Sequence, residues 1–292
     1  MNLRILALLL ITLAVITTSC NIFDKEEPLP MFIKVEQPSV ILNEQGLTSS
    51  IGVKDLWINR GADFLGIYEP GQVIPVFPGE SERFLMTGGI FNSGLSGFRR
   101  KYPFWRSVEQ TIPYSALDTV TVRPTFKYFA RDTALTYVFE EDFETGGRSL
   151  VNRAGSDPNV LFQRSAVSVF EGSQSGRAIF NSRDTVMDIV SERDFTLPTT
   201  GQKSIWLEVR FKSDIPFAAG LFYEEVGQGN FGPIGGDILY KSDDWTTVFI
   251  PLTDPVRGLA GANLRYRIWF RADGQRESGT LYLDYIRLIH FV

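Results

Sequence analysis

Two segments of this chain carry an apolar side chain at every second position, and this alternation constrains the fold more than any other feature. The apolar set of the first segment is Ile205, Leu207, Val209 and Phe211, and its polar-face set is Trp206, Glu208, Arg210 and Lys212. The corresponding sets of the second segment are Leu264, Tyr266, Ile268 and Phe270, and Arg265, Arg267, Trp269 and Arg271. A period of two places each set on one face of a β-strand. Both segments are therefore expected to be strands.

The region from Met31 onward consists of short strand-like runs that end at Gly, Pro or Asn. Clear examples are Val53–Asn59, Phe64–Tyr68 and Val73–Phe77. Runs of this length and spacing are typical of an all-β sandwich, and no stretch has convincing helical periodicity. The run from Leu56 to Gly79 resembles the strand–turn–strand opening of small surface-associated β domains, which implies an immunoglobulin-like or transthyretin-like sandwich.

The chain has 292 residues, which predicts two domains behind a short leader. We expect residues 1–19 to be a signal peptide, 20–30 a flexible tether, 31–130 the first β-sandwich domain and 133–292 the second domain. Tyr137–Glu144 and Leu281–Leu288 resemble the first and last strands of galactose-binding-like jelly rolls, the fold of many carbohydrate-binding modules. The fold class expected for the whole chain is all-β.

The leader ends at the only cysteine of the chain, Cys20. A basic Arg4, an apolar run from Ile5 to Ile16 and small residues before the cut are the parts of a secretory signal. The arrangement resembles the lipobox of bacterial lipoproteins, although Thr17 stands where Leu is usual. The resemblance implies acylation of Cys20, a lipid anchor in the membrane and location in the cell envelope. An incidental thiol after an ordinary signal peptide is the alternative, whereas the apolar run is too short for a permanent spanning helix.

The tether contains Lys25-Glu26-Glu27 and two prolines, which oppose packing. Lys25-Glu26-Glu27 also resembles the short signal that places some lipoproteins on the outer face of the outer membrane. A merely soluble linker explains the same residues.

Charge and histidine content exclude several classes of function. The formal net charge is −5, and removal of residues 1–19 takes away Arg4 and leaves −6, which argues against nucleic acid as a partner. His290 is the only histidine, so Ser-His-Asp and Cys-His catalysis and a zinc site with several His or Cys ligands are not expected. An enzyme of this sequence would have to use carboxylates.

The segment Phe98–Arg106 is a basic, aromatic island in an acidic protein. One interpretation is a binding loop for an anionic or sugar partner, because arginine and aromatic side chains make strong contact anchors. The other is that Tyr102, Phe104 and Trp105 cap the core while the basic side chains face solvent.

A second candidate ligand surface follows from the two alternating strands. If both belong to one sheet, their polar faces present Trp206 and Trp269 among arginines, namely Arg210, Arg265, Arg267 and Arg271. Indole rings match the apolar faces of sugars, and guanidinium groups donate to hydroxyls or carboxylates, so this face predicts a glycan ligand and would suit an acidic one. Alternatively, the tryptophans cover an edge and the arginines pair with acids.

Three carboxylates, Glu141, Asp142 and Asp284, belong to the expected first and last strands of the second domain. In the jelly rolls that the chain resembles, acids at this place often hold a structural Ca²⁺, which takes oxygen ligands. These carboxylates could also simply be solvated.

The sequence therefore predicts a lipid-anchored, non-catalytic envelope protein that binds a glycan through the jelly roll. The alternatives are a structural accessory of an envelope protein complex and, least favoured, a carboxylate-based glycan-active enzyme.

Overall fold

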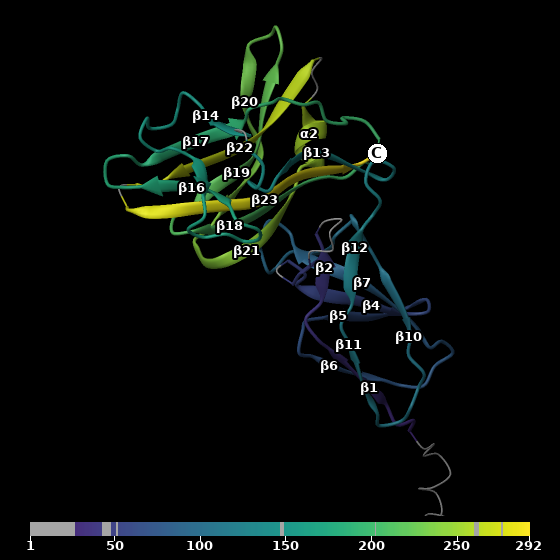
Figure 1. The fold of residues 1–292 in the computed structure, drawn as a ribbon. Coiled ribbons are helices and arrows are strands. Elements are labelled where there is room, and N and C mark those ends of the chain that lie inside the picture. The colour runs from purple at the N-terminus through teal and green to yellow at the C-terminus, as the bar shows by residue number, and fades with distance from the viewer. Residues whose placement is uncertain are drawn as a thin grey trace, which may run out of the picture.

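The computed structural model describes residues 27–42, 48–50, 52–146, 149–201, 203–259, 263–275 and 277–292. Within these ranges the chain is almost entirely strand, and the one helix is the short α2 (Thr253–Gly258). None of the described helices is long and apolar enough to cross a bilayer. The leader, Cys20 and most of the tether lie outside the described residues. Figure 1 shows two β units, and the all-β prediction is confirmed.

The first unit, here the N-terminal unit, contains three small sheets. The three-stranded sheet has the order β11 (Thr119–Val122), β1 (Met31–Val35) and β6 (Val73–Val76). The five-stranded sheet has the order β10 (Val108–Thr111), β7 (Arg83–Phe91), β4 (Asp55–Arg60) and β5 (Asp63–Tyr68), and β8 (Arg99–Lys101) pairs with β7. The four-stranded sheet has the order β3 (Thr48–Ser49), β2 (Ser39–Ile41), β12 (Thr125–Tyr128) and β9 (Trp105–Arg106). The first and last strands of the N-terminal unit lie side by side. β1 pairs with β11, and β2 pairs with β12, both in parallel.

The second unit, here the C-terminal unit, is a sandwich of two antiparallel sheets. The near sheet, which faces the N-terminal unit in Figure 1, has the order β15 (Gln163–Ser165), β16 (Ser175–Phe180), β23 (Gly279–Phe291), β18 (Ile205–Ser213) and β21 (Ser242–Pro251), with β13 (Leu135–Glu141) also on β23. The far sheet has the order β14 (Leu150–Asn152), β17 (Val186–Ser191), β22 (Leu264–Asp273), β19 (Phe217–Glu225) and β20 (Asn230–Leu239). The first and last strands, β13 and β23, pair with Glu140 opposite Arg287.

The near sheet is buried on both faces. The apolar residues of β18, such as Leu207 and Val209, enter the core between the two sheets of the C-terminal unit, as their alternation predicts. The other face of this sheet joins the core of the N-terminal unit through Trp206, Phe249 and Tyr285. One continuous apolar cluster therefore connects the two units.

Candidate functional site

The predicted ligand face is not a single surface. Trp206 lies on β18 of the near sheet, whereas Trp269 lies on β22 of the far sheet. Both side chains are buried, with 3% and 8% of their surface exposed. The prediction that they share one face was wrong, because alternation assigns residues to a strand face but does not assign the strand to a sheet.

Arg210 belongs to a buried polar cluster between the two units. Its partner Glu208 accepts hydrogen bonds from Arg210 Nη1 at 2.8 Å, Tyr102 Oη at 2.6 Å and Tyr128 Oη at 2.8 Å. Arg210 Nη1 also donates to the carbonyl oxygen of Tyr285 at 3.0 Å. Burial raises the pKa of Tyr102 well above its usual value and that of Tyr128 to about 12, so both hydroxyls remain donors at neutral pH. These four side chains, here the interdomain polar cluster, leave Arg210 inaccessible to a ligand.

The predicted calcium ligands are not assembled into a site. Glu141 Oε1 accepts from the backbone N–H of Phe143 at 2.5 Å, and Asp142 Oδ1 from that of Glu144 at 3.1 Å. Asp284 is fully buried. Across the described ranges, no group of three His, Cys, Asp or Glu side chains is placed to hold a metal ion. The pairing of β13 with β23 brings the backbones together, but the carboxylates are used locally.

Asp284 instead forms a buried contact with the loop before β16. Its carboxylate accepts backbone N–H bonds from Phe170 at 3.1 Å and from Tyr285 at 2.8 Å. Burial raises the pKa of Asp284 to about 7, even though these backbone donors favour the charged form.

This raised pKa predicts a pH dependence of stability. In the unfolded chain the carboxyl titrates near 4, so between about pH 4 and 7 the folded protein binds more protons than the unfolded one. The contribution of the protonated carboxyl to folding stability is fully present below the pKa of the unfolded chain and is lost as the pH rises toward 7. At pH 5 we expect Asp284→Asn to have a lower free energy of unfolding than the wild type, and at pH 8 we expect this difference to be lost. Urea unfolding of both proteins at the two pH values measures it. The slope is at most about 1.4 kcal/mol per pH unit for one group. A difference between the two proteins that does not change with pH would contradict the expectation.

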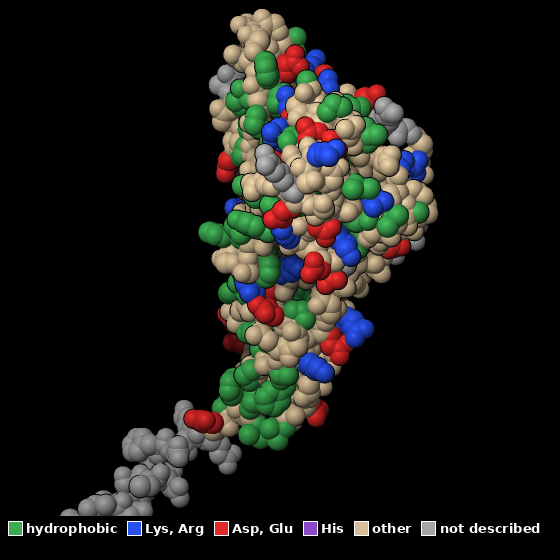
Figure 2. Space-filling model, turned by 90° about the vertical axis from the view of Figure 1, so that its left-hand side faces the viewer, with side chains coloured by type: hydrophobic (Ala, Val, Ile, Leu, Met, Phe, Trp, Pro, Cys, Tyr) green, Lys and Arg blue, Asp and Glu red, His purple; other side chains and the backbone are tan. Residues whose placement is uncertain are grey.

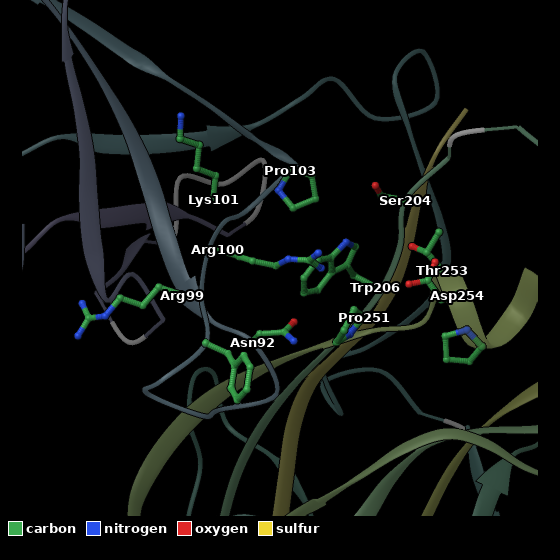
Figure 3. Close-up of a pocket in the computed structure, with 12 residues that line it drawn as sticks. Asn92, Arg99, Arg100, Lys101, Pro103, Ser204, Trp206, Pro251, Thr253 and Asp254 are labelled. Carbon is green, nitrogen blue, oxygen red and sulfur yellow. The ribbon is translucent and has the colours of Figure 1, made fainter. Parts of the chain in front are cut away.

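The sequence did not predict the groove that lies between the two units, here the interdomain groove (Figure 3). It has a volume of about 640 Å³. One wall comes from the N-terminal unit and contains Asn92, Phe98, Arg99, Arg100, Lys101 and Pro103. The opposite wall comes from the C-terminal unit and contains Ser204, Trp206, Pro251, Thr253, Asp254 and Pro255.

Only one of the three basic residues on β8 points toward Trp206. Figure 3 shows Arg100 extended toward the indole, and its guanidinium carbon lies 5.8 Å from the ring centroid. Arg99 forms an ion pair with Asp55 at 3.1 Å, and Lys101 Nζ lies 5.3 Å from the Trp57 ring centroid. Neighbouring residues of a strand point to opposite sides, so on β8 Arg100 faces Trp206, whereas the charged ends of Arg99 and Lys101 are turned away from it.

The turn that precedes β8 is fixed to the C-terminal unit. The backbone N–H of Ser93 donates to the carbonyl oxygen of Phe249 at 2.9 Å, and Ser93 Oγ donates to Asp237 Oδ2 at 2.6 Å. Asn92 is therefore held at the base of the groove. Its Oδ1 atom is buried and has no hydrogen-bond partner within the described part of the chain. Phe98, by contrast, is 64% exposed at the rim.

Both interpretations of the basic, aromatic island are partly realised. Tyr102, Phe104 and Trp105 are buried in the core, while Arg100 and Phe98 line the groove. The basic, aromatic island therefore indicated one wall of the interdomain groove at the level of the sequence. The other wall follows more than 90 residues later, and no local pattern joins the two.

The arginines predicted on β22 do share one face, which lies on the outside of the far sheet. Asp188 organises this face, because it accepts from Trp269 Nε1 at 2.8 Å and from Arg153 Nη1 at 2.9 Å, and Arg271 lies 3.2 Å away. Arg265 and Arg267 line a smaller hollow of about 230 Å³ beside it. The alternative interpretation therefore holds for Arg271, which pairs with an acid, but not for Trp269, which lies on the central strand β22 and not at an edge.

Similarity to known proteins is confined to structure. No family model matches the chain, and no curated protein matches it. Solved structures similar to it include the CBM22-1 xylan-binding domain of Paenibacillus barcinonensis Xyn10C, at 14% identity and a TM-score of 0.37 over 55% of this chain and 97% of that one. TmCBM61 in complex with β-1,4-galactotriose is similar at 13% identity and a TM-score of 0.35 over 52% and 97%. A carbohydrate-binding module of the β-sandwich superfamily is similar at 10% identity and a TM-score of 0.40 over 91% and 99%. At such values the likeness assigns neither ligand nor activity to this chain.

Proposed function

We propose that this chain is a lipid-anchored, non-catalytic protein of the cell envelope, held at the outer membrane, that binds a glycan in the interdomain groove. The observation that carries the glycan assignment is the pairing of Arg100 with Trp206 inside a groove whose lining also contains two further basic side chains, one amide, two hydroxyls and one acid. The lipid anchor is supported by the leader and by the position of the sole cysteine.

The chemistry of the groove suits a molecule with many hydroxyl groups. Arg100 and the Asn92 amide can donate hydrogen bonds, whereas the Asp254 carboxylate can accept them. Phe98 and the prolines offer apolar surface to the faces of sugar rings. Ligand sites with a few fixed polar groups occur preferentially at domain interfaces.

The enzyme alternative requires two carboxylates that face each other across the bound sugar. Among the described residues that line the groove, Asp254 is the one carboxylate. This composition supports a binding role over hydrolysis.

Arginine 100 provides the sharpest test of the groove. On a glycan array, the Arg100→Ala variant should bind any wild-type hit roughly 10–100-fold more weakly, because a hydrogen bond from a charged group is worth about 1.5–3 kcal/mol. Arg83→Ala is the matched control, since this arginine is exposed on β7 of the N-terminal unit and does not line the groove. Trp206 is unsuitable for this purpose because it is part of the core.

Two results would contradict the groove assignment. Equal binding by Arg100→Ala and wild type would remove the groove from recognition, and loss of binding in Arg265→Ala would move it to the far sheet. A silent array together with a defined protein complex in a pull-down would favour the accessory role.

A further inference from the structure

The N-terminal unit carries a cluster of exposed apolar side chains at its lower end. Leu29, Phe77 and Leu117, here the tip patch, are 54%, 52% and 61% exposed. Figure 2 shows hydrophobic side chains gathered at this end of the molecule. A contiguous apolar patch on a folded protein normally marks an interaction surface.

The members of the tip patch are held together by backbone contacts. The backbone N–H of Leu117 donates to the carbonyl oxygen of Pro30 at 2.9 Å, and Tyr114 Oη donates to the carbonyl oxygen of Leu29. Met31 pairs with Val76, which places Phe77 beside Pro30. The patch is thus part of the folded unit.

Leu117 adopts a backbone conformation that leucine rarely takes. Its φ of 65° lies in the left-handed region, which is normally occupied by glycine or asparagine. Such a conformation costs free energy and persists only where its surroundings impose it, and it is often found at functional sites. Here the residue in the strained conformation is a leucine whose side chain is exposed to solvent.

The tip patch lies where the chain leaves the folded unit toward Cys20. Leu29 lies nine positions after Cys20 in the sequence, so the two residues are at most about 32 Å apart even when the chain between them is fully extended. An acyl chain on Cys20 would therefore hold this end of the molecule close to the bilayer. The C-terminal unit lies at the opposite end (Figure 1).

We propose that the tip patch inserts into the interfacial layer of the bilayer that holds the lipid anchor. This inference rests on the proposed acylation of Cys20. Apolar side chains that enter this layer add to the affinity of an acyl anchor, since binding grows with the buried apolar area. Contact at the tip also orients the molecule, with the interdomain groove directed away from the membrane surface.

The experiment uses the full mature lipoprotein purified from membranes and reconstituted into phosphatidylethanolamine–phosphatidylglycerol vesicles. An environment-sensitive fluorophore is attached through Ala116→Cys, an exposed site next to Leu117 that leaves the patch intact. We expect blue-shifted emission and quenching by brominated lipid. The control site is Phe231→Cys. Phe231 is 65% exposed on the C-terminal unit, so a fluorophore attached there should have the emission expected in water. Adding Phe77→Ser and Leu117→Ser to the Ala116→Cys protein should return its emission to that of water.

The outcomes separate the two proposals. Wild type that takes up the thiol-reactive dye has a free Cys20, which would contradict the lipid anchor itself. Wild type that excludes the dye, combined with a water-like and unquenched signal at position 116, would overturn the tip proposal alone. Shielding that appears in native membranes but not in pure lipid vesicles would also overturn it, and would assign the patch to a protein partner.

Discussion

Replacement of Glu208 by alanine should lower the free energy of unfolding by about 3–5 kcal/mol, because it leaves a buried charge without its partner. Arg210 would lose its ion pair of 2.8 Å, and the hydroxyls of Tyr102 and Tyr128 would lose their acceptor. Neither charged group can reach water, since Glu208 is fully buried and Arg210 is 2% exposed. Urea unfolding followed by tryptophan fluorescence measures the loss.

The matched control is Glu109→Ala, which breaks the ion pair of 2.6 Å with Arg83 on the surface. An exposed pair of this kind contributes about 0–1 kcal/mol. Removing both charges in Glu208→Leu with Arg210→Met should be less harmful than Glu208→Ala, because no unpaired charge remains. Equal effects of Glu208→Ala and Glu109→Ala would show that the interdomain polar cluster is not desolvated.

The second large effect is expected for Trp206→Ala, at about 3–5 kcal/mol for loss of a buried tryptophan. The indole packs edge-on against Tyr102, with ring centroids 5.6 Å apart, and belongs to the apolar cluster that connects the two units. We expect the wild type to unfold in one calorimetric transition. The variant should show two transitions, because the shared core no longer couples the units.

Phe231→Ala serves as the control for this change, because the ring is exposed on the C-terminal unit and its removal creates no cavity. It should leave a single transition with an almost unchanged midpoint. If Trp206→Ala also keeps one transition, the coupling between the units must come from other contacts.

The fold class could be predicted from the sequence because it depends on local pattern. Leu207 and Val209 alternate with polar residues, and they do enter a sandwich core. The same holds for Tyr266 and Ile268 on β22. Alternation in one strand depends only on the pleat, which every β-strand shares.

The candidate site could be predicted only in part, because its two walls meet through tertiary packing. Arg100 stood out as one of several basic residues near aromatic ones, but its orientation toward Trp206 depends on how the units dock. Glu208 and Arg210 carry the polar pattern of a solvent face, yet a second unit covers that face. Burial of a polar face by a neighbouring domain leaves no periodic signal in the strand.

Because both faces of the near sheet are buried, the two units of this protein cannot be separated without exposing one face of that sheet. A fragment that begins at residue 133 would expose Trp206, Phe249 and Tyr285 to water, along with an ion pair that is buried in the intact protein. Such a fragment would be prone to self-association, and its behaviour would say little about the intact molecule. The recognition groove would be missing from it as well, because half of the lining belongs to the piece that was removed.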